Sequence, residues 1–316
     1  MHPLVSVIVT TKNEEKNIGM CLKSIKCQSY RNIEIIVVDN YSGDKTKEIA
    51  GRYTDLVYDK GDGMAAQRNY GVGVCGGEYI IYVDADMILA PFTIESCVGV
   101  FKSNPLITGL YIPEIIIGRR LWSKIRRFER SFYDATVIDA VRFIKKDVFI
   151  KAKGFDESFS PFADWDFNRK ISVLGEPELL GAYAVPDYLN GAENHFETEV
   201  ENFLVFNGFS REDLSNKYNN VIFHNETNMN LSGYLRKKSR YIKEDYHKYI
   251  NKWGKDDIIV RKQFGLFYRY FKIFTENGKW KKLLRHPFLA IYTLSFKTAV
   301  GLIYLKFRLP GGGGHN

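Results

Sequence analysis

The sequence has few cysteines and no signal-like start. Cys21, Cys27, Cys75 and Cys97 show no CxxC spacing and no histidine-rich surroundings, which argues against a zinc site or a disulfide framework. No basic segment followed by an apolar stretch stands at the N-terminus, where residues 4–11 already have the pattern of a strand. These absences predict a protein that works in the reducing cytoplasm.

Long apolar runs are also scarce. The best candidate, residues 287–305, is interrupted by Lys297, and a helix that spans a bilayer needs about 20 predominantly apolar residues. We therefore expect this segment to lie in a membrane interface. A membrane span and a helix packed against the protein body stay open as alternatives. The glycine-rich tail, residues 310–316, is interpreted as a linker outside the fold.

Positive charge, in contrast, is concentrated in the C-terminal quarter. Residues 232–309 hold 19 Lys and Arg against 5 Asp and Glu, a net +14, whereas the remainder holds 26 against 32, a net −6. This pattern predicts a negatively charged partner, such as an anionic membrane surface, a lipid phosphate or a nucleic acid. No RNA- or DNA-binding motif accompanies it, so nucleic acid is not expected. We predict that residues 231–309 form a basic amphipathic helical region that associates with a membrane. Its apolar face would include Phe264, Phe267, Tyr268, Phe271, Phe274, Trp280, Phe288 and Leu289.

The N-terminal part alternates between two patterns. Continuous apolar runs at 4–11, 33–40 and 79–83 predict buried strands, and the spacing of apolar residues at 14–28 and 44–53 predicts helices. This alternation is typical of a doubly wound α/β fold with a mostly parallel sheet flanked by helices. Ligands bind such sheets at the carboxyl ends of the strands. We therefore expect functional residues at these ends.

Polar clusters follow three of the predicted strands. They are Thr11 to Glu14, Asp39 with Asn40, and the triplet Asp84, Ala85 and Asp86. The two carboxylates of the triplet project in the same direction, because side chains of an extended chain alternate with a period of two. Such carboxylates beside a buried strand are costly without counter-charge, so a cation is expected there. Aspartates that cap a turn or helix are the alternative for an isolated pair.

Six motifs then occur in a fixed order over roughly residues 4–175: VSVIVTTKNEEKNIGMCLKSI, IIVVDNYSGDKT, AAQRNYGV, YIIYVDAD, GFDESF and ADWDFNRKISVLG. As a set they resemble glycosyltransferase family 2. The resemblance implies a GT-A fold and inverting transfer from a UDP- or GDP-sugar with Mn²⁺ or Mg²⁺. The basic C-terminal helices resemble those of members that act on lipid-linked acceptors, which implies a peripheral position on the inner face of the cell membrane.

The same resemblance implies a domain organisation. Residues 1–230 would form the catalytic domain, with a nucleotide-sugar half at about 1–90 and an acceptor half at about 91–230. The helical, membrane-associating region would follow at 231–309. Residues 183–223 show no pattern from which elements can be assigned.

The resemblance also implies a set of donor-binding residues at the strand ends: Thr11, Asn13, Glu14, Asp39, Arg68, Asp84, Ala85 and Asp86. Asp39 would accept hydrogen bonds from the base or its ribose. Asp84 would contact the ribose or a metal-bound water, and Asp86 would bind the divalent cation. Hard cations of this kind prefer carboxylate and phosphate oxygens.

The catalytic base of the family is the aspartate of a Glu-Asp pair at the start of a helix. Asp164 matches that aspartate, but Ala163 stands where the glutamate is usual, which leaves open whether Asp166 takes part. For each aspartate, capping of the helix is the alternative. His224 resembles a histidine that completes the metal or diphosphate site in some members, with His195 as its competitor.

Two other functions stay open. The alanine at position 163 is compatible with a catalytically inactive glycan- or nucleotide-binding protein. A sugar-nucleotide nucleotidyltransferase would be expected to carry a glycine-rich, basic phosphate loop after the first strand, whereas TTKNEEKN has no glycine before Gly19. The GxGxxG match at residues 71–76 precedes a strand instead of following one, which argues against a dinucleotide-binding dehydrogenase.

Overall fold

A seven-stranded sheet forms the centre of the protein, in the order β3-β2-β1-β4-β8-β6-β9. The computed structural model describes residues 2–182 and 196–308. One strand, β8 (Val141–Lys145), runs antiparallel to the others, which are β1 (Val5–Thr11), β2 (Ile33–Asp39), β3 (Val57–Asp59), β4 (Tyr79–Asp84), β6 (Gly109–Tyr111) and β9 (Glu178–Leu179). The predicted α/β fold with a mostly parallel sheet is confirmed.

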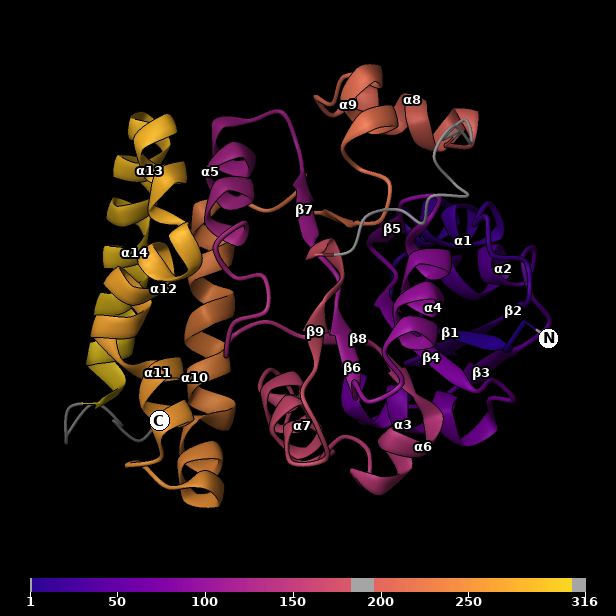
Figure 1. Cartoon of the computed structure of the whole chain (residues 1–316), viewed down its shortest axis with the longest axis horizontal. Coiled ribbons are helices and arrows are strands. Elements are labelled where there is room, and N and C mark those ends of the chain that lie inside the picture. The colour runs from indigo at the N-terminus through magenta and orange to yellow at the C-terminus, as the bar shows by residue number, and fades with distance from the viewer. Residues whose placement is uncertain (1, 183–195, 309–316) are drawn as a thin grey trace.

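Helices cover both faces of this sheet (Figure 1). One core packs the sheet against α1 (Ile18–Lys26), α2 (Thr46–Ala50) and α4 (Thr93–Ser103). A second core packs the opposite face against α3 (Met64–Val74), α6 (Lys146–Lys151) and α7 (Ala163–Ser172). Successive side chains of β1 point to opposite faces of the sheet, so Val7 and Val9 lie in the first core and Ile8 lies in the second. The fully apolar strands are thus buried on both faces.

A smaller sheet of three strands lies next to the end of β4. Its order is β5 (Met87–Leu89), β10 (Ile222–Asn225) and β7 (Glu114–Ile117). β5 continues the chain directly after the Asp84 to Asp86 triplet, and its Met87 lies opposite His224 of β10. The pairing therefore brings a histidine from far along the chain to the end of β4.

Two helices lie in the segment that showed no assignable pattern. α8 (Thr198–Phe206) and α9 (Arg211–Asn216) pack Val200, Leu204 and Leu214 against Ile88 and Phe223 of the small sheet. The expectation of an irregular segment at 183–223 is therefore wrong from residue 198 onward. Residues 183–195, and with them His195, lie outside the described part of the chain.

The C-terminal quarter is helical, as predicted, and forms a layer beside α7 (Figure 1). Its helices are α10 (Leu231–Trp253), α11 (Ile258–Phe264), a π-helical turn η3 (Tyr268–Lys272), α12 (Ile273–Thr275), the 3-10 turn η4 (Glu276–Gly278), α13 (Trp280–Arg285) and α14 (Pro287–Arg308). Within the described residues, no helix has both the length and the apolar character needed to cross a bilayer.

This layer shares buried contacts with the rest of the molecule. Tyr249 of α10 and Phe264 of α11 belong to the same core as the sheet-covering helix α7. Phe132, just after α5 (Leu121–Arg130), packs on Phe274 with ring centroids 4.8 Å apart. Apolar packing therefore holds the C-terminal helices against the rest of the protein.

Candidate active site

The loops that follow β1 and β2 are joined by hydrogen bonds. Asn13, which has the left-handed φ of 54°, accepts a bond from the Gly43 amide at 2.9 Å through its side chain. Asp39 is fully buried, and its carboxylate accepts bonds from the Ser42 amide at 2.6 Å and the Ser42 hydroxyl at 2.5 Å. The structure thus brings the predicted nucleotide-binding residues Asn13 and Asp39 to one edge of the sheet.

Glu14 and Thr11 lie at the same edge. The Glu14 amide donates to Thr46 at 2.8 Å, and its carboxylate accepts from the Asn17 side chain at 2.6 Å. Burial raises the pKa of Glu14 above its ordinary value. The buried Thr11 hydroxyl has no hydrogen-bond partner among the described residues.

Arg68 of α3 joins the two halves of the site. Its Nη2 lies 3.0 Å from Asp84 Oδ1 and its Nη1 lies 2.5 Å from Asp164 Oδ1. The guanidinium is fully buried and stacks over the rings of Tyr82 and Phe155, at 4.8 and 5.2 Å from their centroids. Because its aromatic and acidic neighbours fix its orientation, Arg68 places Asp164, the candidate base, next to the predicted donor-binding triplet.

A second buried arginine, Arg142 of β8, was not predicted from the sequence. Its Nη1 lies 3.8 Å from Asp84 Oδ2, and its Nη2 lies 2.9 Å from Glu114 Oε1. Burial alone would raise the pKa of Asp84, but Arg68 and Arg142 hold it below its ordinary value. The available signal was an arginine inside the otherwise apolar stretch VRFI, residues 141–144.

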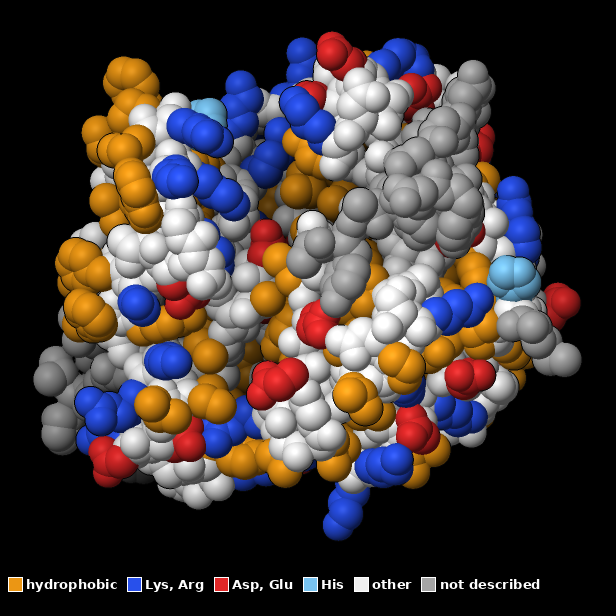
Figure 2. Space-filling view, in the orientation of Figure 1, with side chains coloured by type: hydrophobic (Ala, Val, Ile, Leu, Met, Phe, Trp, Pro, Cys, Tyr) orange, Lys and Arg blue, Asp and Glu red, His pale blue; other side chains and the backbone are white. Residues whose placement is uncertain are grey.

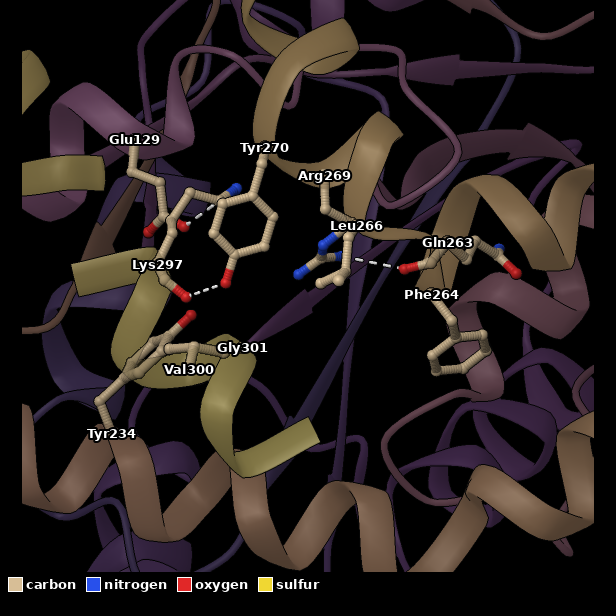
Figure 3. A pocket seen from close by; sticks show the side chains of 10 residues that line it. All are labelled: Glu129, Tyr234, Gln263, Phe264, Leu266, Arg269, Tyr270, Lys297, Val300 and Gly301. Atoms are coloured by element: carbon tan, nitrogen blue, oxygen red, sulfur yellow. Dashed lines mark hydrogen bonds and ion pairs between the residues drawn. The ribbon is translucent and has the colours of Figure 1, made fainter. Parts of the chain in front are cut away.

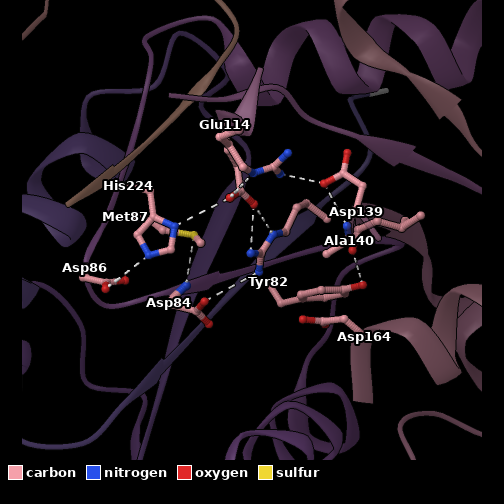
Figure 4. A network of polar contacts seen from close by, with 12 residues as sticks. Tyr82, Asp84, Asp86, Met87, Glu114, Asp139, Ala140, Asp164 and His224 are labelled. Atoms are coloured by element: carbon pink, nitrogen blue, oxygen red, sulfur yellow. Dashed lines mark hydrogen bonds and ion pairs between the residues drawn. The ribbon is translucent and has the colours of Figure 1, made fainter. Parts of the chain in front are cut away.

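Asp86 faces His224. The two side chains approach to 3.3 Å between Oδ2 and Nε2, and His224 Nδ1 lies 3.6 Å from Glu114 Oε2, so the imidazole stands between two carboxylates (Figure 4). Although burial lowers the pKa of His224, Asp86 and Glu114 raise it to about 10. The other Asp86 oxygen, Oδ1, is buried without a hydrogen-bond partner in the described part of the chain. This oxygen is available to a cation.

The predicted metal ligands Asp84, Asp86 and His224 do not form a complete metal site by themselves. Across residues 2–182 and 196–308, no group of three or more His, Cys, Asp or Glu side chains is arranged to hold a metal ion. Asp84 is engaged by two arginines, which leaves Asp86 and His224. The residues therefore fit a divalent cation only where phosphate oxygens or waters complete its shell.

Asp166 lies apart from this cluster. It is fully buried and contacts Lys252 at 2.6 Å, Trp253 Nε1 at 2.9 Å and Lys170 at 3.1 Å. Residues two apart in a helix point away from each other, so Asp164 faces Arg68 while Asp166 faces α10. The structure does not bring Asp166 to the reacting groups and gives it a role in holding α7 against α10.

A cavity of about 200 Å³ adjoins the His224 side of the site. Its lining includes Phe162 and Trp165, stacked with centroids 4.7 Å apart, and Glu114 and His224. Basic side chains of α5 and α10 also line it. Asp164 is not among its lining residues.

The overall geometry is that of a GT-A glycosyltransferase. The structure of the mannosyltransferase PcManGT from Pyrobaculum calidifontis, in complex with GDP-Man and Mn²⁺, shares this fold with a TM-score of 0.55 and 17% identity, covering 96% of this chain and 88% of that one. The family model for glycosyl transferase family 2 matches residues 6–157. Residues 6–157 therefore belong to glycosyltransferase family 2, as the sequence motifs predicted.

Curated relatives agree with this assignment. An uncharacterized glycosyltransferase of Rickettsia typhi is 29% identical over 266 residues, 76% of this chain and 82% of that one. Chondroitin synthase of Escherichia coli is 25% identical over 224 residues, which cover 63% of this chain and 32% of that one. For glycosyltransferase GlyG of Streptococcus pneumoniae the match is 38% identical over 30% of this chain and 34% of that one. The matched segment is thus about a third of the length of the last two relatives.

Proposed function

We propose that the chain is an inverting glycosyltransferase that moves a sugar from a UDP- or GDP-sugar to an acceptor hydroxyl or phosphate. The observation that carries this proposal is the Arg68 bridge between Asp84 and Asp164. Through this bridge the Asp164 carboxylate lies beside the carboxylates at the strand ends. Asp164 lies beyond residue 157, where the match to the family model ends. A site that only bound a nucleotide would not need this second carboxylate.

In this mechanism Asp164 is the general base. Its carboxylate would accept the proton of the acceptor group while that group attacks the anomeric carbon from the face opposite the diphosphate. The sugar would pass through an oxocarbenium-like state, as in glycoside hydrolysis. Arg68 orients Asp164 for this task, since its guanidinium is fixed by Tyr82 and Phe155. Inversion follows from a single displacement.

Asp86 would hold the divalent cation, Mn²⁺ or Mg²⁺, through its Oδ1, which has no hydrogen-bond partner among the described residues, and His224 would join it as a ligand in its neutral form. When bound, the cation would neutralise the charge that develops on the leaving diphosphate. Thr11, Asn13, Glu14 and Asp39, at the adjoining strand ends, would line the nucleotide pocket together with the backbone at Ala85.

The test is incubation of the purified chain with UDP- and GDP-sugars, Mn²⁺ and candidate acceptors, with the anomeric configuration of the product read by NMR. We expect transfer, or slow donor hydrolysis, with inverted configuration. Retained configuration would reject the mechanism. Binding without turnover would favour an inactive binding protein, and formation of a nucleotide sugar from a sugar phosphate would favour a nucleotidyltransferase.

We also propose that the protein lies on the inner face of the cell membrane and acts on a lipid-linked acceptor. Leu284, Phe288 and Ile291, on α13 and α14, are 72%, 79% and 62% exposed. Figure 2 shows hydrophobic side chains along the edge that these helices form, with Lys and Arg beside them. Apolar side chains bordered by positive charge suit an anionic lipid surface.

The apolar face of this surface differs from the expected one. The expected set was Phe264, Phe267, Tyr268, Phe271, Phe274, Trp280, Phe288 and Leu289. Phe264, Tyr268 and Phe274 are buried inside the protein instead, because they pack against α7 and against the end of α5. The proposed membrane surface is therefore restricted to exposed side chains, chiefly those of α13 and α14.

A further inference from the structure

Glu114 lies where the chain passes from the large sheet to the small one. It is the first residue of β7 and comes three positions after Tyr111, the last residue of β6. Its partner on the parallel strand β10 is Ile222, two residues before His224. Since alternate residues of a strand point to the same face, the side chains of Glu114 and His224 project from one face of the small sheet.

Both oxygens of the Glu114 carboxylate have partners. Oε1 accepts a hydrogen bond from Arg142 Nε at 3.0 Å, and Arg142 Nη2 lies 2.9 Å from the same oxygen. Oε2 accepts a hydrogen bond from Arg130 Nε at 3.3 Å and lies 3.6 Å from His224 Nδ1. The side chain is buried. The two arginines therefore fix the carboxylate in place beside the imidazole.

Two short chains of contacts lead from Glu114 to the aspartates at the end of β4 (Figure 4). On one side, Arg142 Nη1 lies 3.8 Å from Asp84 Oδ2. On the other side, His224 Nε2 lies 3.3 Å from Asp86 Oδ2. One buried carboxylate thus stands between the partner of Asp84 and the partner of Asp86.

These contacts fix the imidazole of His224 at both of its nitrogens. A neutral imidazole donates from one nitrogen and accepts at the other, and a carboxylate next to Nδ1 favours the form that carries the proton there. The lone pair of Nε2 is then on the side of Asp86, whose Oδ1 is buried without a hydrogen-bond partner among the described residues. A carboxylate that orients a metal-binding histidine in this way increases metal affinity.

We propose that Glu114 is a positioning residue of the donor site, which holds His224 so that Nε2 faces Asp86 and the cation of the donor. The proposal rests on the proposed function, since that function assigns Asp86 and His224 to the cation. The competing interpretation is that Glu114 only neutralises Arg130 and Arg142 inside the protein. The two interpretations differ in whether the effect of Glu114 depends on His224.

The first experiment is calorimetric titration of the whole chain with UDP and with GDP, in Mn²⁺ and in chelator. Glu114→Gln leaves one acceptor oxygen, for which two arginines and the histidine compete. It should reduce the gain in nucleotide affinity that Mn²⁺ provides by about tenfold, the scale for loss of a group that orients a metal-binding histidine. Binding in chelator should be nearly unchanged. An undiminished Mn²⁺ gain would overturn the proposal.

A double-variant cycle tests whether Glu114 acts through His224. In the His224→Ala chain, Glu114→Gln should cause no further loss of the Mn²⁺ gain, because the group that it positions is already absent. Losses of equal size with and without His224 would show that Glu114 acts on the fold alone, and the proposal would fail.

Glu129 offers a matched control. It is a second buried carboxylate and pairs with Arg126 and Lys297 beside a small cavity of about 30 Å³ (Figure 3). In the described part of the chain, none of its ion pairs involves a predicted donor-binding residue or His224. Glu129→Gln should lower the melting temperature, as Glu114→Gln does, but keep the Mn²⁺ gain. Loss of that gain in both variants would reject the positioning role.

Glu114→Asp is the second variant if Glu114→Gln does not fold. It keeps the negative charge between the arginines but withdraws it from the imidazole by one methylene, so the Mn²⁺ gain should still fall. A full gain in this variant would overturn the proposal.

The unaltered chain separates failure of this proposal from failure of the proposed function. If it binds neither UDP nor GDP, the proposed function is rejected, and this proposal with it. If it binds a nucleotide equally well in Mn²⁺ and in chelator, the cation site and the role of Glu114 are both rejected. A Mn²⁺ gain that Glu114→Gln leaves intact rejects only the role of Glu114.

Discussion

The two sides of the active site are built in different ways. On the donor side, Asp39 is satisfied by Ser42, three residues further along the chain, and the polar residues directly follow strands. On the acceptor side, Arg126 pairs with Glu226, 100 residues away, and Arg68 pairs with Asp164, 96 residues away. The proposed donor side therefore depends mainly on the ends of neighbouring strands, with His224 as the residue that comes from far along the chain, whereas the proposed acceptor side depends on how distant elements pack.

Loss of the divalent cation, which would bind on the donor side, should have the largest effect on turnover. Removal of divalent cation with excess EDTA should reduce turnover by about a thousandfold or more, because the cation supplies several kcal/mol of charge stabilisation. Added Mn²⁺ or Mg²⁺ should restore it, which separates chelation from unfolding. Undiminished turnover in EDTA would show that basic residues alone neutralise the diphosphate, and the contrast between the two sides would fail.

The next largest effect concerns Asp164, the candidate base that Arg68 links to the donor side. Asp164→Asn should lower turnover at least about a hundredfold, the typical scale for a general base, with donor binding retained. Asp166→Asn is the matched control, since it should lower the melting temperature by loosening Lys252 and Trp253 but keep most turnover. If only Asp166→Asn lowers turnover, the base has been misassigned.

A smaller effect concerns the histidine that the small sheet brings to the donor side. His224→Ala should weaken metal-dependent donor binding by about tenfold, since it removes a group at the Asp86 carboxylate. The comparison is His195→Ala, for which a weaker effect is expected. Donor titrations with and without Mn²⁺ measure both, and an equal or reversed order would reject the choice of His224.

The smallest effect should appear at the membrane surface, far from the chemistry. Joint substitution of Leu284, Phe288 and Ile291 by Gln should reduce co-sedimentation with anionic liposomes severalfold. Hydrolysis of the soluble nucleotide-sugar donor should be unchanged. The control variant replaces two other exposed apolar residues, Leu106 and Val173, which are 87% and 84% exposed. Binding should also weaken as salt is raised. Failure of the unaltered chain to sediment at low salt would reject the membrane proposal.

These tests use the whole chain because the structure argues against truncation near Lys255. Phe264 packs in the core shared with α7, and Phe274 packs on Phe132. Loss of the final helices would expose both contacts. A truncated chain that failed to bind liposomes would therefore report unfolding as readily as a lost membrane surface.

Much of the donor side could be predicted because its signals are local. Apolar runs that end in polar clusters define strands and their carboxyl ends, and the order of six motifs identified the family. Arg142 and Glu114 were missed, since β8 and β7 belong to different sheets and their ion pair depends on how the two sheets lie against each other. The helix α8 was missed although Val200, Phe203 and Leu204 have helical spacing, and α9 was missed because Leu214 is its one apolar residue.

By itself, the sequence determined the α/β fold, the strand ends that hold Asp39, Asp84 and Asp86, and the basic, helical character of the C-terminal quarter. Each of these follows from periodicity and composition along a short stretch. Only the tertiary structure decided that Arg68 joins Asp84 to Asp164, that Asp166 turns toward α10, and that lysines of α10 line a cavity. Such outcomes depend on side-chain direction and on contacts between distant elements, which a pattern along one chain does not contain.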